Sequence, residues 1–285
     1  MSKRMALILA LAVVASACAN SDLGRSIPAC PTDTGAINSV GGSMILQMQA
    51  VETAEYVPCL NDLKVGWSYE HLIAKRSNSR FWLDSDRLGS HFLEVVLTPE
   101  CDLGAATQVS ASQPDVEEFR DIELVGSTAT IVIVPVTGRE TGYALEIEAE
   151  LEARQINDRQ IFVVFDEREI PLADKVEEAG RRDRPIIIVD EQDALAGTAT
   201  LQMPGENQSV RGLDLDELLD RIEDQLPEPS FTGVWFTVFE GGCITYEFDA
   251  SGPGVDRLAG DIEEALGLFP AGDVWRVMRE VGVVG

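Results

Sequence analysis

The stretch Thr130–Val136, with the sequence TIVIVPV, is an unbroken apolar run of the length of a buried strand. A helix pattern follows at Tyr143–Arg154, and a second apolar run occupies Gln160–Phe165. A helix pattern at Leu172–Arg181 then leads to the run IIIV at 186–189. Alternation of strands and helices is typical of an α/β unit with a largely parallel sheet. We therefore predict such a unit in the middle of the chain.

The chain on either side of this unit follows a different pattern. Short β-branched and aromatic runs, separated by Asn, Asp, Gly and Pro, predict an antiparallel meander. Downstream, Gly241-Gly242 separates two alternating runs and predicts a hairpin with a two-residue turn. Helix patterns at Val255–Leu266 and Asp273–Val281 close the chain. The runs of the meander are Met44–Gln49, Trp67–Ile73, Arg80–Asp84 and His91–Leu97.

Residues 1–18 have the form of an export signal. Ser2-Lys3-Arg4 is a basic start, Met5–Val14 is a run of ten apolar residues, and small residues precede Cys18. Such a run is too short to cross a bilayer core of about 30 Å. The small-small-Cys pattern resembles the bacterial lipobox, in which the cysteine is lipidated. We expect a protein that is exported and lipid-anchored through Cys18 to the outer face of the cell membrane, with plain secretion or an uncleaved anchor as alternatives.

The other four cysteines bear on the fold. An even number of cysteines outside the cytoplasm predicts two disulfides, and the sequence leaves all three connectivities open. No two of them have the C-x-x-C spacing of a metal site. Residues 19–39 are small, polar and turn-forming, which predicts a tether between the lipid and the folded chain. The disulfide candidates are Cys30, Cys59, Cys101 and Cys243.

The charge of the chain is strongly acidic, with 22 Lys and Arg against 49 Asp and Glu. A chain of this charge lacks the positive surface that supplies most affinity for nucleic acid. Acidity of this kind usually favours solubility. Calcium is the alternative, but no EF-hand loop is present and the acidic runs lack ligand spacing. We expect no metal and no cofactor.

Three motifs of the middle segment follow one another at regular spacing. They are Asp166-Glu167-Arg168-Glu169, then Lys175-Val176, then Arg184-Pro185 before the apolar run IIIV. Their order resembles the anticodon-binding domain of class II aminoacyl-tRNA synthetases. A predicted strand at Thr198–Met203 and an amphipathic helix at Leu213–Gln225 extend the resemblance, which covers about residues 128–226. It implies a sheet-and-helix module of that fold.

The same segment departs from the synthetase pattern. Ala173 stands where the family usually has Gly, and residues 157–159 lengthen one connection. Between Glu123 and Glu228 there are 25 acidic and 10 basic residues. Fold similarity does not carry function by itself. We therefore expect the fold without anticodon binding, and no nucleic acid as a partner.

The flanks carry a second resemblance. Cys59, Cys101-Asp102, the run from Arg80 to Arg87 and Gly241-Gly242-Cys243 are similar to a set of uncharacterised actinobacterial exported proteins. The resemblance implies that 40–122 and 230–285 form one β-rich domain. We thus predict an α+β protein in which a β-rich, disulfide-containing domain carries an inserted α/β module at 123–229. None of the cysteines lies in the insert, which agrees with this division.

No catalytic set stands out in the sequence. The two histidines, His71 and His91, lie in predicted strands, and surface or packing roles account for them. Nucleophile-elbow, zinc-protease and phosphate-loop motifs are missing from the sequence. Paired carboxylates are numerous, and none is singled out. A possible ligand or partner face is formed by Trp82, Asp84, Asp86, Arg87 and Arg168.

Our leading hypothesis is a membrane-anchored lipoprotein with a non-catalytic binding or accessory role in the cell envelope. Its partner would be an envelope protein or a small ligand, and we expect no enzymatic activity. The first alternative is an exported hydrolase that acts through carboxylates such as Asp84 and Asp86. The second is a small-ligand-binding module at the strand ends of the insert, near Pro135–Thr137 and Asp166–Arg168.

Overall fold

The computed structural model describes residues 24–31, 40–111, 113–137, 140–154, 156–157, 159–206 and 208–280. These residues form seven helices and fourteen strands, arranged in two compact units. Unit 1 comprises the chain up to Leu124 and from Phe231 onward, and unit 2 is Val125–Ser230. The predicted export signal and Cys18 lie outside the described residues. Every helix in the described part of the chain is too short or too polar to cross a bilayer.

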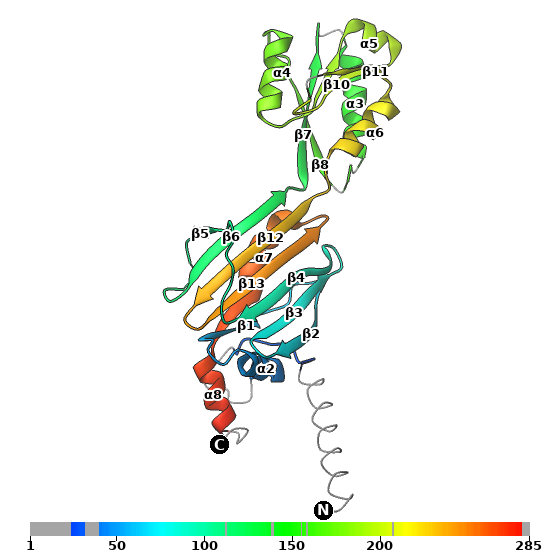
Figure 1. The fold of residues 1–285 in the computed structure, drawn as a ribbon. Helices are drawn as coiled ribbons and strands as arrows, with labels where there is room; N and C mark the ends of the chain where they lie inside the picture. Colours follow the sequence, from blue (N-terminus) through cyan, green and yellow to red (C-terminus); the bar gives the residue numbers. More distant parts are fainter. Residues whose placement is uncertain are drawn as a thin grey trace, which may run out of the picture. The chain divides into compact units, whose positions relative to one another are not determined.

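Unit 1 is built on a seven-stranded sheet with the strand order β2-β3-β4-β13-β12-β6-β5 (Figure 1). The meander β2-β3-β4 is antiparallel, as the sequence predicts. β1 and β14 pair separately, with Tyr56 opposite Pro270. The strands are β1 Tyr56–Leu60, β2 Trp67–Lys75, β3 Asn78–Ser85, β4 Gly89–Thr98, β5 Thr107–Val109, β6 Glu117–Val125, β12 Ser230–Phe239, β13 Gly242–Ser251 and β14 Leu266–Pro270.

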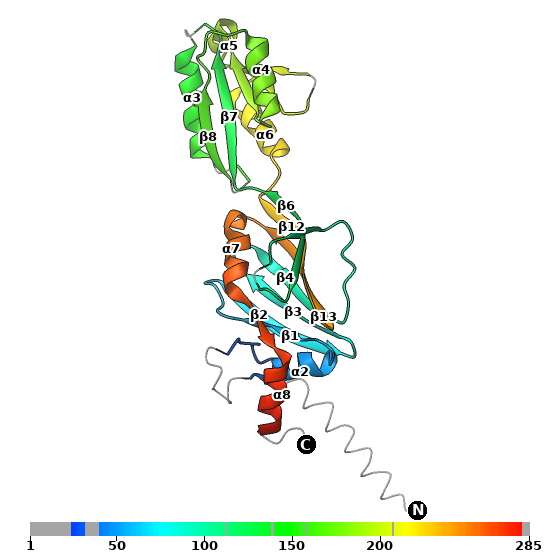
Figure 2. The same cartoon turned by 90° about the vertical axis from the view of Figure 1, so that its left-hand side faces the viewer.

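Three helices complete unit 1: α2 Gly42–Ala50, α7 Val255–Ala265 and α8 Ala271–Glu280. α7 lies along one face of the large sheet (Figure 2). Its Leu258 and Ile262 pack in one core with Tyr246 and Phe248, which alternate with exposed residues along β13. This alternation places every second side chain on the face under the helix.

Both predicted disulfides are present, and both lie in unit 1. Cys30 bonds to Cys59, and Cys101 bonds to Cys243. The Cys30–Cys59 disulfide links the predicted tether, residues 19–39, to β1. In that segment Gly24 accepts hydrogen bonds from the Leu72 amide at 2.8 Å and from the Tyr69 hydroxyl at 2.7 Å. Residues 24–31 are therefore bonded to the β-rich unit.

Unit 2 contains a five-stranded sheet with the order β11-β10-β9-β7-β8. All five elements of the predicted α/β unit form, and β7 pairs in parallel with both β8 and β9, as expected. The two strands that follow this unit add antiparallel pairs, β10 with β9 and with β11, so the complete sheet is mixed. The strands are β7 Thr128–Pro135, β8 Gln160–Phe165, β9 Ile186–Val189, β10 Ala199–Gln202 and β11 Val210–Leu213.

Helices cover both faces of this sheet (Figure 1). On one face Ile147 and Leu151 of α3 pack with Leu218 of α6. On the other, Ala179 of α4 packs with Val132 and Val134 of β7. The helices are α3 Thr141–Ala153, α4 Leu172–Arg181, α5 Glu191–Ala196 and α6 Leu215–Gln225.

Two local predictions in unit 1 are wrong. Met44–Gln49 is predicted as a strand, but it forms α2, because Met44 and Met48 stack on one helical face and are both buried. Gln47 is also buried there, and its amide donates to the carbonyl oxygen of Pro58 at 3.1 Å. The hairpin turn lies one residue earlier than predicted, at Glu240-Gly241, and Gly242 already belongs to β13.

Candidate functional site

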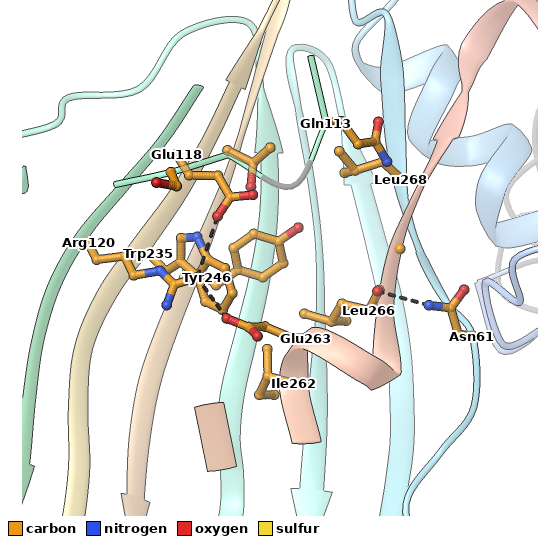
Figure 3. Close-up of a pocket in the computed structure, with 13 residues that line it drawn as sticks. Asn61, Gln113, Glu118, Arg120, Trp235, Tyr246, Ile262, Glu263, Leu266 and Leu268 are labelled. Carbon is orange, nitrogen blue, oxygen red and sulfur yellow. Dashed lines mark hydrogen bonds and ion pairs between the residues drawn. The ribbon is translucent and has the colours of Figure 1, made fainter. Parts of the chain in front are cut away.

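A cavity of about 540 Å³ opens in unit 1 between the sheet, α7 and β14 (Figure 3). Strand alternation brings its charged and aromatic residues to one face: Glu118 and Arg120 are two residues apart on β6, and Trp235 and Tyr246 come from β12 and β13. Glu263 reaches it from α7. We call it the Arg120 cavity; its lining includes Asn61, Glu118, Arg120, Trp235, Tyr246 and Glu263.

Arg120 is the central group of this cavity. Its guanidinium carbon lies 3.7 Å from the ring centroid of Trp235. One terminal nitrogen is 2.9 Å from Glu263 Oε1 and 3.5 Å from Glu118 Oε2. Such a cation over an indole face is attracted by the ring quadrupole, and more strongly where water is excluded. The stack and the two ion pairs fix the guanidinium in one position.

The cavity wall contains buried polar groups. Glu118 is only 4% exposed, and burial raises the pKa of Tyr246 well above its ordinary value. Trp235 Nε1 and Arg120 Nε are buried without a hydrogen-bond partner among the described residues. Buried N–H groups in folded proteins are nearly always paired, so these two donors are exceptional in the wall of the cavity.

The chemistry of this wall favours recognition over catalysis. Glu118 and Glu263 are a pair of carboxylates in a hollow, the arrangement that a glycosidase uses. Here both are engaged by the same Arg120 nitrogen, so neither stands free to protonate a leaving group. No histidine lines the cavity. Among the described residues, no group of three or more His, Cys, Asp or Glu side chains is placed to hold a metal ion.

The residues that the sequence singles out are divided between the units. Trp82 and Asp84 lie on β3, and the turn that follows holds Asp86 and Arg87, all in unit 1. Arg168 lies in unit 2. None of these residues lines the Arg120 cavity, and a face shared by all five stays a prediction.

Trp82 is instead the centre of a cluster with both histidines. Its ring centroid is 5.6 Å from those of His71 and His91. Glu70 bridges the two imidazoles, at 3.2 Å from His71 Nδ1 and 2.8 Å from His91 Nε2. Asp84 accepts the backbone amide of His91 at 2.7 Å. The bulge between Tyr69 and Leu72 in β2 brings Glu70 to this position, and sequence periodicity does not show a bulge.

A second cavity, of about 340 Å³, lies in unit 2 where β8 ends. Val132 and Val164 form an apolar part of its wall, and the charged residues come from α4 and its flanking loops. We call it the basic pocket; its charged lining is Asp166, Arg168, Lys175, Glu178, Arg182 and Arg184.

Ion pairs order the basic pocket. Arg168 donates to both oxygens of Asp166, at 2.8 and 2.6 Å, and to Glu178 at 2.8 Å. This bidentate bond lowers the pKa of Asp166 below its ordinary value. Lys175, buried on α4, donates to the carbonyl oxygen of Asp166 at 2.8 Å. The Asp-x-Arg and Lys motifs of the sequence thus meet at one strand end.

The motifs and the fold agree with the comparison to known families. Residues 130–225 match the family model of the anticodon binding domain. The resemblance to the anticodon-binding domain of class II synthetases is confirmed for this part of the chain. No curated protein matches the chain.

Two solved structures are similar over 35% of the chain. One is the RNA binding domain of threonyl-tRNA synthetase from Cryptosporidium parvum Iowa II, with 16% identity and a TM-score of 0.29. The other is histidyl-tRNA synthetase from Nostoc sp. PCC 7120, with 17% identity and a TM-score of 0.29. The chain covers 24% and 23% of these two chains.

These comparisons correct one expectation. From the charge of the module we expect no nucleic acid as a partner, but the matched family is named for anticodon binding. The exclusion is wrong because net charge is a sum over a whole surface. Arg168, Arg182 and Arg184 are few among the 25 acidic residues between Glu123 and Glu228, yet they gather at one pocket.

Proposed function

We propose that the protein is an exported binding protein of the cell envelope, anchored by a lipid on Cys18, that holds a small ligand in the Arg120 cavity without chemical turnover. The observation that carries this proposal is the Arg120–Trp235 stack between two carboxylates. It supplies a fixed set of polar groups in a cavity of about 540 Å³, within the size range of small-molecule sites.

The arrangement of the chain is also part of this proposal. We propose that unit 2 is an insertion into the β-rich domain, as the sequence predicts. The chain leaves unit 1 from β6 and returns through β12, and these two strands are neighbours in the sheet. An inserted domain is tolerated where its two ends lie close together.

Mass spectrometry of the native protein extracted from membranes tests both parts. We expect a diacylglycerol mass on Cys18 and, under non-denaturing conditions, the added mass of a small molecule. The Cys18→Ser variant should move to the soluble fraction with its ligand, and Trp235→Leu should stay in the membrane and lose it. A native protein without a lipid on Cys18 would contradict the membrane anchor. A wild-type protein without a bound small molecule at any growth stage would contradict the ligand-binding function.

A second candidate function is binding of single-stranded RNA by unit 2. Phe162 and Val164 are 48% and 45% exposed on the edge strand β8, near the basic pocket. Aromatic rings beside arginines form the usual surface for unpaired bases and their phosphates. Binding of a labelled anticodon stem-loop should weaken when Phe162→Ala or Arg184→Gln is introduced. Affinity that is the same for both variants and for wild type would contradict this function.

A further inference from the structure

We infer that the ligand of the Arg120 cavity is a neutral, polyhydroxylated molecule of the saccharide class. This inference rests on the proposed function and adds the chemical class of the ligand. It follows from the charge, the hydrogen-bonding groups and the apolar part of the cavity wall.

The charges of the wall disfavour a charged ligand. Arg120 and the two carboxylates Glu118 and Glu263 together carry one net negative charge, so an anion would meet repulsion. A cation would have to compete with Arg120, which lies between the carboxylates. Arg120 already holds both carboxylates, which leaves hydrogen bonding as the main means of recognition.

The hydrogen-bonding groups are of mixed type. The carboxylates accept, and the guanidinium of Arg120 donates. Gln113 and the hydroxyl of Ser110 both donate and accept, and both line the cavity. The carboxamide of Asn61 donates to Leu266 O at 3.0 Å and to Glu264 O at 3.2 Å, which orients its oxygen. A hydroxyl group is also both donor and acceptor, so a ligand with several hydroxyls matches this mixture.

The remaining wall is apolar. Ile262 of α7 and Leu266 and Leu268 of β14 line it, and the two leucines are on the same face of the strand (Figure 3). A sugar ring presents C–H groups on its faces and hydroxyls around its edge. Such a molecule would place one face on the leucines and its edge toward Arg120, Glu118 and Gln113.

An array of immobilised oligosaccharides tests the inference with the full-length lipoprotein in detergent. The array should carry neutral glycans and, as probes of charge, anionic uronic-acid glycans and cationic glucosamine glycans. We expect binding to neutral glycans. Gln113→Leu and Arg120→Gln should each weaken it about tenfold, the loss of one good hydrogen bond. Gln49→Leu is the matched control, because Gln49 is exposed on α2 away from the cavity, and it should bind like wild type.

Each outcome decides the inference. Neutral-glycan binding that falls with Gln113→Leu but not with Gln49→Leu supports it. Binding confined to charged glycans, binding unaffected by Gln113→Leu, or no glycan binding overturns it. Native mass spectrometry distinguishes failure of this inference from failure of the proposed function. A bound small molecule that is not a saccharide would overturn the inference and leave the binding function in place. A wild-type protein without any bound molecule would contradict both.

Discussion

Arg120 on β6 lies with its guanidinium 3.7 Å from the ring centroid of Trp235 on the neighbouring strand β12. The same guanidinium holds Glu263, which is 143 residues further along the chain. One side chain thus connects the sheet to α7, and its removal has consequences for stability as well as for binding.

Replacement of Arg120 by Ala should lower the free energy of unfolding of unit 1 by about 2 kcal/mol, because it removes the stack and leaves the buried Glu118 without this ion pair. Tryptophan fluorescence in urea measures this directly, since Trp67, Trp82, Trp235 and Trp275 all lie in unit 1. Arg76→Ala, at an exposed position, should change it by less than about 0.5 kcal/mol. Equal effects of the two variants would contradict a structural role of the stack.

Gly233 in β12 should not tolerate a side chain. Its φ is 122°, and a Cβ atom would collide with the backbone of Asp121. Gly233→Ala should therefore destabilise unit 1 by about 3 kcal/mol or more. Gly260→Ala makes the matched comparison, because Gly260 is exposed within α7 with open space around it, and it should stabilise by about 0.5–1 kcal/mol. Urea titration gives the free energy of unfolding of both variants. A Gly233→Ala variant as stable as the wild-type protein would contradict the close approach of β12 and β6.

Elements that are specified by neighbouring residues can be predicted from the sequence, and elements that depend on distant pairing cannot. Leu172–Arg181 is predicted as a helix and forms α4 with the same bounds, because its apolar spacing and its Pro171 start are local signals. β1 and β14 are missed because their residues pair across about 200 positions and β1 contains Pro58. Met44–Gln49 is misassigned because a short apolar run fits a buried helix and a strand equally well.

The candidate site could be predicted only in unit 2. The Asp166, Arg168 and Lys175 motif is contiguous enough to be read from the sequence, and the structure brings its members together. The Arg120 cavity has no such signal, because Arg120, Trp235 and Glu263 come from three distant segments. The periodicity of the sequence around each of these residues predicts a strand or a helix. It does not predict that the three side chains line the same cavity.

Unit 1 should lose stability at high pH through Tyr69. Burial raises the pKa of Tyr69 to about 12, and its hydroxyl donates to Gly24 O at 2.7 Å. Because the folded pKa exceeds the unfolded value of about 10, this contribution is present in full below pH 10 and is lost as the pH rises through 12. Tyr69→Phe should flatten the fall in unfolding free energy between pH 10 and 12, measured by urea titration. An unchanged pH profile in the variant would assign the fall to other groups.

Unit 2 should lose stability in acid through Asp166. The hydrogen bonds from Arg168 lower the pKa of Asp166 below its unfolded value, so the folded state favours the ionised carboxylate. This contribution is present above the unfolded pKa of about 3.9 and is lost as the pH falls through the folded pKa. Arg168→Gln should reduce the acid-dependent part of the stability of unit 2, and Glu167→Gln, at an exposed neighbour, should leave it unchanged.

Amide hydrogen exchange of β7 and β8 is the suitable measurement for this prediction, because unit 2 has no tryptophan. Protection in these strands should fall with decreasing pH in the wild-type protein and in Glu167→Gln, and the fall should be smaller in Arg168→Gln, which starts from lower protection. If the three proteins share one pH profile, the bidentate bond between Asp166 and Arg168 does not set the acid stability of the module. Tertiary packing of α4 on β7 would then be the main source of order at the basic pocket.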